Sequence, residues 1–342
     1  MDGVRLPVQD ELRRLVTGWQ MRAIQHGGDD FAYIDTLDEL LYFGECRFID
    51  YVQFGDTGSF AVHLKDWLGN LDTEEEKKLL FKLLGWLTFV DKKQMQALYQ
   101  DAFSRIVYPW IMMGRATRDD YMSPRHDIGV LERLRPYHFL SITLSFNLPE
   151  FERANNLQGL PEMRVLGEDE EVAQVVVQRL ATTRDHGSGL IILEDFVGTG
   201  NQVKRVLSGI RDYVNEDWRC LFVPLIMLQS GMQNIEDLRR EFPSLRVEPV
   251  LVIPDSHCVK ETPMPDEPKE FIHFRSLVRN TARRVIQPLD ASDDPPTNPF
   301  GYEGSGALVV TCHNAPNNTL PILHHHAPRW KPLFQRIHHA RR

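Results

Sequence analysis

The chain has 342 residues, of which 42% are hydrophobic and 25% charged, and its formal net charge at pH 7 is −9. This length and composition allow a substantial core, in two domains or in one large domain with an appendage. The acidic balance argues against a general binder of nucleic acid or membrane surfaces, which needs a basic field. The four cysteines form no C-x-x-C pair, no apolar stretch is long enough to span a membrane and the N-terminus has no signal pattern, so we expect a reduced, cytoplasmic protein.

The first third of the chain has a helical pattern. Apolar residues recur at helical spacing over residues 12–24, and a second helix is expected over 94–108, ending before Pro109. We therefore expect residues 1–122 to form a helical module. Its large aromatic side chains are expected to form its core or, alternatively, a surface that binds a protein partner. These aromatic residues are Trp19, Trp67, Phe81, Trp86, Phe89 and Trp110.

Two further helices in this region are predicted from capping boxes. Thr36 with Glu39, and Thr73 with Glu76, have the spacing at which a threonine and a glutamate satisfy each other's terminal amides. The predicted helices cover residues 37–51 and 77–89.

From Pro136 onward the pattern changes to alternating strands and helices. The expected strands cover residues 139–144, 189–194, 221–228, 245–253 and 307–312, and the expected helices cover 170–183, 201–215, 234–241 and 270–286. This alternation predicts an α/β fold over residues 136–342, with a mainly parallel twisted sheet flanked by helices. The Pro- and acid-rich stretches 254–270 and 288–306 are expected to be solvated linkers, the first alternatively a flap.

The second expected strand ends in a layout typical of a binding site. An apolar run is followed by Glu194 and Asp195 (the acid pair), and Gly198–Gly200 (the Gly-Thr-Gly loop) then precedes a helix. Small residues let backbone amides approach an anion at a helix N-terminus, and ligands of parallel sheets bind where strands end. An ordinary strand-to-helix turn, with acids that cap the helix, remains the alternative.

This pattern resembles the phosphoribosyl diphosphate (PRPP) signature of the type I phosphoribosyltransferases, namely four apolar residues, two acids and a Thr-Gly phosphate loop. The resemblance covers residues 136–254. It implies that the acid pair is catalytic and holds the ribose hydroxyls, and that Mg²⁺ accompanies PRPP. It also implies a set of residues around the 5′-phosphate. These are Gly198, Thr199, Gly200, Asn201 and Gln202.

The chain departs from the family pattern at three positions. Phe196 stands where the family has a small aliphatic residue or serine, and Gly198 and Gln202 stand where it has hydroxyl side chains. One phosphate-binding hydroxyl is therefore missing. Thr199, Asn201 and the backbone amides remain, so phosphate binding is expected, whereas turnover stays open. Other phosphate motifs fit worse, because the chain has no P-loop Lys-Ser/Thr run and Val203 replaces the third glycine of a dinucleotide-binding fingerprint.

A polar loop follows the last expected strand. The segments Asn314–Pro321 and Trp330–Phe334 resemble phosphoribosyltransferase-like proteins encoded in bacterial anti-phage conflict systems. This resemblance implies a role in anti-phage defence and a loop that belongs to the site, while a side-chain-capped turn is the alternative. The loop residues implied are His313, Asn314, Asn317 and Asn318.

Two further groups of side chains are candidates for binding a metal ion or pyrophosphate. Neighbouring histidines at His324–His326 do not have metal-ligand spacing, so no protein metal site is expected there. Arginines near the first strand of the α/β region are candidates for binding the leaving pyrophosphate. These are Arg133, Arg135, Arg153 and Arg164.

Three functions remain open from the sequence. The first is a divergent phosphoribosyltransferase-like enzyme, in which an acceptor displaces pyrophosphate from PRPP. The second is a non-catalytic sensor or effector subunit that binds PRPP or a nucleotide and signals through the helical module. The third is a protein-interaction module that binds no phosphosugar.

Overall fold

The structure is a computed structural model and describes residues 5–27, 29–51, 58–112, 132–157, 164–167, 169–183, 189–214, 218–288 and 296–336. The chain forms two compact units. Residues 93–255 make up one, here called the sheet unit. Residues 1–92 and 256–342 together make up the other, here called the two-segment unit.

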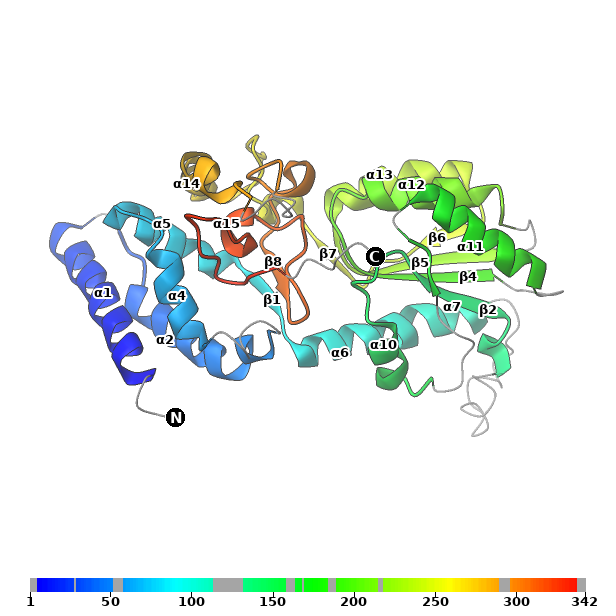
Figure 1. Ribbon diagram of the computed structural model, residues 1–342, viewed down its shortest axis with the longest axis horizontal. Coiled ribbons are helices and arrows are strands. Elements are labelled where there is room, and N and C mark those ends of the chain that lie inside the picture. Colours follow the sequence, from blue (N-terminus) through cyan, green and yellow to red (C-terminus); the bar gives the residue numbers. More distant parts are fainter. Residues whose placement is uncertain are drawn as a thin grey trace. The chain divides into compact units, whose positions relative to one another are not determined.

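A parallel sheet is the centre of the sheet unit, with strand order β3-β2-β4-β5-β6 and with β7 also paired to β5 (Figure 1). The strands are β2 (Tyr137–Ser141), β3 (Arg164–Val165), β4 (Gly189–Val197), β5 (Arg219–Leu228), β6 (Leu245–Val247) and β7 (Leu251–Ile253). The central strands β4 and β5 are apolar and buried along most of their length, as expected for a parallel sheet that is covered on both faces. The predicted α/β fold with a mainly parallel sheet is confirmed.

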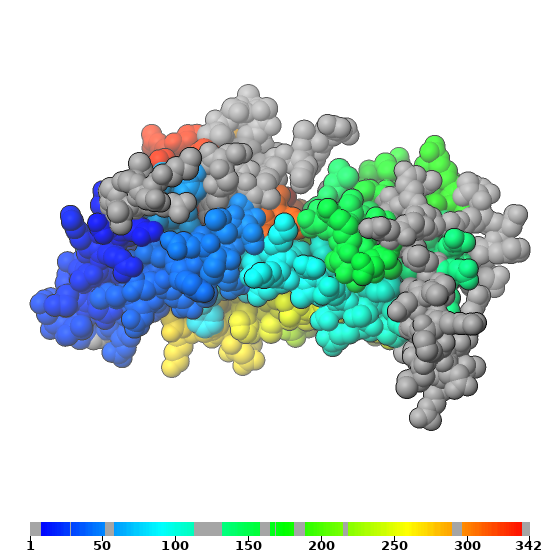
Figure 2. Space-filling view, turned by 90° about the horizontal axis from the view of Figure 1, so that it is seen from below, coloured from blue at the N-terminus to red at the C-terminus, as the bar shows by residue number. Residues whose placement is uncertain are grey.

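Helices cover both faces of this sheet (Figure 1). On one face lie α11 (Glu170–Thr183), α12 (Asn201–Arg211) and α13 (Gln229–Glu241), whose apolar side chains share a core with β4 and β5. On the other lie α6 (Lys92–Asp101) and α10 (Leu148–Ala154), which are neighbours on the surface in Figure 2. Asn155 Nδ2 donates a hydrogen bond to the Tyr99 carbonyl at 3.1 Å and links these two helices.

The helix that begins with α6 does not end before Pro109, contrary to the prediction. It continues through a π-helical segment (Ala102–Val107) into α7 (Tyr108–Met112). The Tyr108 N–H donates to the Phe103 carbonyl, one residue further back than in an α-helix. A proline normally breaks a helix because it clashes with the preceding turn, and the wider π turn relieves this crowding.

The two-segment unit combines helices from both ends of the chain. Its helices are α1 (Arg5–His26), α2 (Tyr33–Cys46), α4 (Phe60–Leu68), α5 (Glu74–Leu83), α14 (Phe271–Val285) and α15 (Pro321–His324), with short 3₁₀ turns at Phe48–Asp50, Leu84–Trp86 and Tyr302–Gly304. Strand β1 (Thr88–Val90) pairs in parallel with β8 (Val309–Thr311). A single hydrophobic cluster joins the two segments, with Trp19, Trp67 and Phe81 from the first and Phe271 and Trp330 from the second.

These units differ from the predicted division into residues 1–122 and 136–342. The last predicted strand pairs with β1 rather than with the larger sheet, and α14 packs against α5. Trp110, predicted in the core of the helical module, lies in the sheet unit, where the Arg219 guanidinium is 4.0 Å from its ring centroid. The chain leaves the two-segment unit and returns to it after 163 residues, given the bounds 93–255. Local periodicity carries no signal of such a return.

Residues 254–270, predicted as a linker or flap, are instead fixed to α14. Arg275 is 3% exposed, and it donates from Nε to the Lys260 carbonyl at 2.7 Å and from Nη2 to Glu267 Oε2 at 2.6 Å. The same Glu267 oxygen accepts the Met264 N–H at 3.0 Å. A buried arginine needs such partners, so this segment is an ordered part of the unit. Part of the second predicted linker, residues 289–295, lies outside the described residues.

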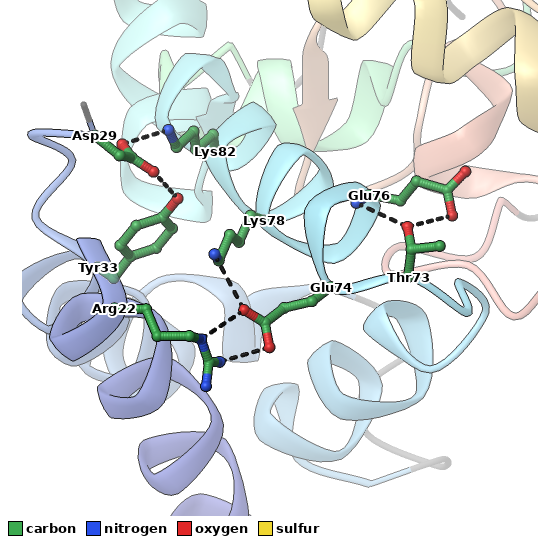
Figure 3. Close-up of polar contacts among 8 residues, drawn as sticks. All are labelled: Arg22, Asp29, Tyr33, Thr73, Glu74, Glu76, Lys78 and Lys82. Atoms are coloured by element: carbon green, nitrogen blue, oxygen red, sulfur yellow. Dashed lines mark hydrogen bonds and ion pairs between the residues drawn. The ribbon is translucent and has the colours of Figure 1, made fainter. Parts of the chain in front are cut away.

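Polar contacts connect α1 and α5 at the edge of the aromatic core (Figure 3). Arg22 donates to both oxygens of Glu74, at 2.9 and 2.5 Å, and Lys78 approaches the same carboxylate at 3.1 Å. Asp29 accepts from the Tyr33 hydroxyl at 2.5 Å and from Lys82 at 2.7 Å. Each exposed pair contributes little alone, but the bidentate arginine fixes the orientation of one helix on the other.

One of the two predicted capping boxes is formed in part, because Thr73 caps the helix while Glu76 meets the Thr73 hydroxyl instead of its backbone N–H. Thr73 Oγ1 accepts the Glu76 N–H at 3.3 Å and donates to Glu76 Oε2 at 2.9 Å, at the start of α5 (Figure 3). The other box is absent, because α2 begins at Tyr33 and Thr36 is therefore inside the helix. Its start is set instead by Gln20, whose side chain accepts the Tyr33 N–H at 2.8 Å.

Thr73→Ala is expected to lower the free energy of unfolding by about 1 kcal/mol, because it removes a side-chain cap. Thr36→Ala is the matched control and should be neutral or slightly stabilising, since alanine favours a helix interior. Urea unfolding of the two variants measures the difference. Equal losses would contradict the assignment of the caps.

Candidate functional site

The acid pair lies near the carboxyl end of β4, beside the end of β2. Ser141, the last residue of β2, is paired with Leu193 in β4, so the chain that follows β2 passes directly over the acid pair. Glu194 is 3% exposed and Asp195 is half-buried. Strand β4 extends to Val197, three residues beyond its predicted end.

Glu194 is enclosed by residues 142–145, here called the acid-binding turn. Glu194 Oε2 accepts the N–H groups of Ile142 and Thr143, both at 3.1 Å. Glu194 Oε1 accepts the Thr143 hydroxyl, and Ser145 Oγ lies 3.4 Å from the same oxygen. Both oxygens of this carboxyl group are therefore engaged by the protein.

Asp195 interacts with both the acid-binding turn and its neighbour in the acid pair. Its Oδ1 accepts the Ser145 hydroxyl and the Phe196 N–H, each at 2.8 Å. The Asp195 carboxyl group also shares a hydrogen bond with the Glu194 side chain.

Burial makes the acid pair costly to ionise. Desolvation, with the nearby Asp195 charge, raises the pKa of Glu194 well above its usual range, against the hydrogen bonds from Thr143. Desolvation also raises the pKa of Asp195, although hydrogen bonds from Ser145 and the Phe196 N–H oppose this. Within the described chain no cation offsets these effects. Acidic groups whose pKa values are raised by burial and by a neighbouring carboxylate are candidates for a functional site.

Glu194→Gln is expected to raise stability at neutral and mildly alkaline pH. The folded-state pKa of Glu194 is raised, so the folded protein binds this proton more tightly than the unfolded chain. The resulting penalty is absent below the unfolded pKa, about 4.3, and grows as pH rises towards the folded pKa. The unfolding midpoint of the variant should exceed that of the parent at pH 8, and the gap should close at about pH 4. A difference in unfolding midpoint that does not depend on pH would show that ionisation of Glu194 does not cause the stability penalty.

The Gly-Thr-Gly loop is packed against the start of α13. Gly200 has a φ of 79°, and a Cβ built on it would lie 2.9 Å from the Gly231 carbonyl oxygen. A Cβ on Gly231 would in turn lie 2.3 Å from the Gly198 carbonyl oxygen. Asn234 Nδ2 donates to the Thr199 carbonyl at 2.7 Å. The glycines are therefore required by this close approach of two backbones, and Asn234 orients the loop.

Helix α12 starts immediately after this loop, and its N-terminus is capped differently from those of its neighbours. Gly200 is its N-cap residue and provides no side-chain acceptor. In contrast, Asn147 caps α10, and Asp255 Oδ1 accepts the Ser230 N–H near the start of α13 at 3.2 Å. The first-turn amides and the dipole of α12 therefore suit an anion.

The polar loop after β8 belongs to the two-segment unit, whereas the acid pair belongs to the sheet unit. Its side chains hold the loop together. Asn314 Oδ1 accepts the Ala315 N–H at 2.9 Å, Asn318 Nδ2 donates to Ser305 Oγ at 3.2 Å, and the Asn317 carbonyl accepts the Tyr302 N–H at 2.8 Å. These contacts agree with the side-chain-capped turn. His313 lies half-buried in the same turn.

Two of the candidate arginines are at the wrong end of the sheet. Arg133 and Arg135 precede β2, so they lie at its amino end, whereas the acid pair lies at the carboxyl end of the adjacent parallel strand. Five strand residues separate the two ends by about 17 Å. Arg153 is exposed on α10, and the side chain of Arg164 lies outside the described part.

Several residues of this site were not identified from the sequence. They are Thr143 and Ser145 in the acid-binding turn and Gly231 and Asn234 at the start of α13. A signal existed for the first two, because small polar residues directly follow an apolar strand that parallel pairing places beside β4. Gly231 and Asn234 had no such signal, since α13 was predicted to begin only at Asn234.

The residues of the site suit Mg²⁺ that arrives with a diphosphate. No group of three or more His, Cys, Asp or Glu side chains in the described chain could hold a metal unaided. Mg²⁺ usually binds one or two carboxylates and completes its shell with water and substrate phosphates, an arrangement that Asp195 can serve.

None of the helices described is long and apolar enough to cross a membrane.

A parallel α/β sheet whose central strand ends in two acids and a Gly-Thr-Gly loop defines a phosphoribosyltransferase-like protein. The chain belongs to the PRTase-CE family, which matches residues 64–336. The match includes the whole sheet unit and the polar loop after β8, so the family extends well beyond the signature itself. No curated protein matches the chain.

Proposed function

We propose that the protein binds PRPP, or a nucleotide with the same ribose 5′-phosphate, at the carboxyl end of β4. The main support is the acid pair, of which Glu194 is buried and Asp195 half-buried, which has no cation among the charges acting on it in the described chain, and which is followed after a short loop by a helix whose N-cap residue is a glycine. Asp195 would accept a hydrogen bond from a ribose hydroxyl. The amides of the Gly-Thr-Gly loop, with Asn201 and Gln202, would hold the phosphate.

In the enzymatic form of this proposal, an acceptor displaces pyrophosphate at C1 of the ribose. The protein's own contribution is positioning, together with negative charge near a ring that becomes oxocarbenium-like. Asp195 would do both. The chemistry that Mg²⁺ supplies when bound is neutralisation of the diphosphate charge.

A non-catalytic sensor or effector is the second candidate, and two observations favour it. Gln202 provides no hydroxyl for the phosphate, and both oxygens of Glu194 are engaged by the acid-binding turn. Release of pyrophosphate from PRPP in the presence of small nucleophiles and nucleobases separates the two candidates. Turnover supports the transferase, whereas saturable binding without pyrophosphate release supports the sensor.

A thermal-shift panel of phosphosugars and nucleotides with Mg²⁺ tests the proposal itself. A ligand at one hundred times its dissociation constant should stabilise the folded protein by about 2.7 kcal/mol. Ribose 5-phosphate, PRPP and nucleoside 5′-monophosphates are the informative members, and free ribose is the control. Stabilisation by none of the phosphorylated compounds would leave the interaction-module hypothesis.

We also propose a role in anti-phage defence, supported by the resemblance of the polar loop and the Trp330–Phe334 segment. A protein partner bound through the two-segment unit would carry the signal. Plating efficiency of a phage panel on cells that express the parent or Asp195→Asn tests this role. Protection that is lost in the variant is expected, and equal plating on parent and empty-vector cells would contradict the role.

A further inference from the structure

The two acids of the pair have different surroundings, although the resemblance assigns them a shared role. Glu194 accepts two backbone N–H groups and the Thr143 hydroxyl from the acid-binding turn, and only 3% of it is exposed. Asp195 is half-buried, accepts the Ser145 hydroxyl and the Phe196 N–H on Oδ1 and shares a hydrogen bond with the Glu194 side chain. A nearly buried carboxyl group whose oxygens already serve three donors from the turn has little capacity left for a ligand hydroxyl.

We infer that the two acids have different roles. Glu194 is a positioning residue that fixes the acid-binding turn, and Asp195 alone contacts the ligand. The inference rests on the proposed function and assigns separate roles within that site. Glu194 acts through Ser145, which the turn presents to Asp195 Oδ1 at 2.8 Å. This contact sets the rotation of the Asp195 carboxylate, which is the more exposed of the two acids and meets a hydroxyl of the ribose.

The turn itself has a second attachment that keeps it in place. The ring of Phe146, which follows the turn, packs edge-on against Tyr99 of α6 with centroids 5.5 Å apart. Phe146 also packs against Phe151 of α10 at 5.9 Å. The turn is therefore held from one side by aromatic packing and from the other by Glu194, which makes it a rigid support for Asp195.

Two measurements on the full chain separate the two roles. The first is amide hydrogen exchange at Ile142 and Thr143, which needs no ligand. The second is the affinity for PRPP with Mg²⁺ by calorimetry. The variants are Asp195→Asn, Glu194→Gln and Glu194→Leu. Glutamine keeps a carbonyl oxygen for both amides and so is the conservative rescue, whereas leucine accepts no hydrogen bond.

Asp195→Asn should weaken PRPP binding by about 30-fold and leave exchange at both amides unchanged. Glu194→Leu should accelerate exchange at both amides by about tenfold or more and weaken binding as well. Glu194→Gln should restore protection and bring affinity to within about threefold of the parent.

The inference is overturned if Glu194→Gln, with both amides protected, loses as much affinity as Asp195→Asn. Unchanged exchange in a folded Glu194→Leu protein would also overturn it, because the turn would then not depend on Glu194. A parent protein that binds neither PRPP nor a nucleotide refutes the proposed function instead. The exchange arm still tests the positioning role of Glu194 in that case.

Discussion

Removal of residues 1–92 is expected to prevent residues 256–336 from folding. The hydrophobic cluster of the two-segment unit draws side chains from both segments, and β8 has its only described strand partner in β1. Without the first segment, large side chains such as Phe271, Phe274 and Trp330, now at most 1% exposed, would face water. Fully burying such a side chain is worth about 1.5–3 kcal/mol, so the loss over several of them is comparable to the whole stability of a typical domain.

Limited proteolysis with mass spectrometry measures this effect on a fragment that comprises residues 93–342. The C-terminal segment should be digested rapidly, while residues 93–255 persist as a core. The fragment 93–255 is the control and should show a cooperative unfolding transition. A protease-resistant C-terminal segment in the absence of residues 1–92 would contradict the two-segment unit and favour the division predicted from the sequence.

Gly200→Ala is expected to destabilise the sheet unit by about 3 kcal/mol, more than its place at a strand end suggests. Two effects add. A φ of 79° disfavours any side chain, and the new Cβ would lie 2.9 Å from a backbone oxygen of α13, which cannot move aside easily. Chemical denaturation followed by far-UV circular dichroism measures the loss.

Gly27→Ala is the matched control, because Gly27 has a φ of 65° but nothing within 4 Å of the built Cβ. It isolates the conformational cost, which should be about 1 kcal/mol. If Gly200→Ala costs no more than Gly27→Ala, the loop is not packed against α13 as described.

The central strands of the larger sheet could be predicted from the sequence because they are continuous apolar runs, whereas β3 was missed and the predicted strand 245–253 is two short strands, β6 and β7. Strand β4 begins at the predicted residue, and α11 has both of its predicted ends. Boundaries failed where tertiary contacts override local signals. Pro109 continues a helix because a π turn precedes it, and α2 starts early because Gln20 accepts the Tyr33 N–H.

The site was predictable only in the part that is contiguous in sequence. The acid pair and the Gly-Thr-Gly loop follow one strand, so a single motif reveals them. The acid-binding turn and Asn234 come from other strand ends, and only the parallel pairing of β2, β4 and β5 brings these ends together. The functional asymmetry of the two acids was hidden for the same reason, since adjacent residues in one motif look equivalent until their partners are known.

The division of the chain could not be predicted because its cause is non-local. Thr88 and Phe89 were predicted as the end of a helix, yet with Val90 they form the strand that pairs with β8 from more than 200 residues away. A three-residue strand has too few positions for a period to be recognised. The residues that match the family, 64–336, include both β1 and β8, so the match extends over both segments that form this pair of strands.

Calorimetric titration of PRPP with Mg²⁺ into the parent and Asp195→Asn proteins is the most direct test of the central claim. The account predicts saturable binding at a single site in the parent. It also predicts affinity that is weaker by at least about tenfold in the variant, whose unfolding midpoint should stay close to that of the parent. Equal affinities in two folded proteins, or no binding by the parent of either PRPP or nucleoside 5′-phosphates, would contradict the claim that this strand end is a phosphoribosyl-binding site.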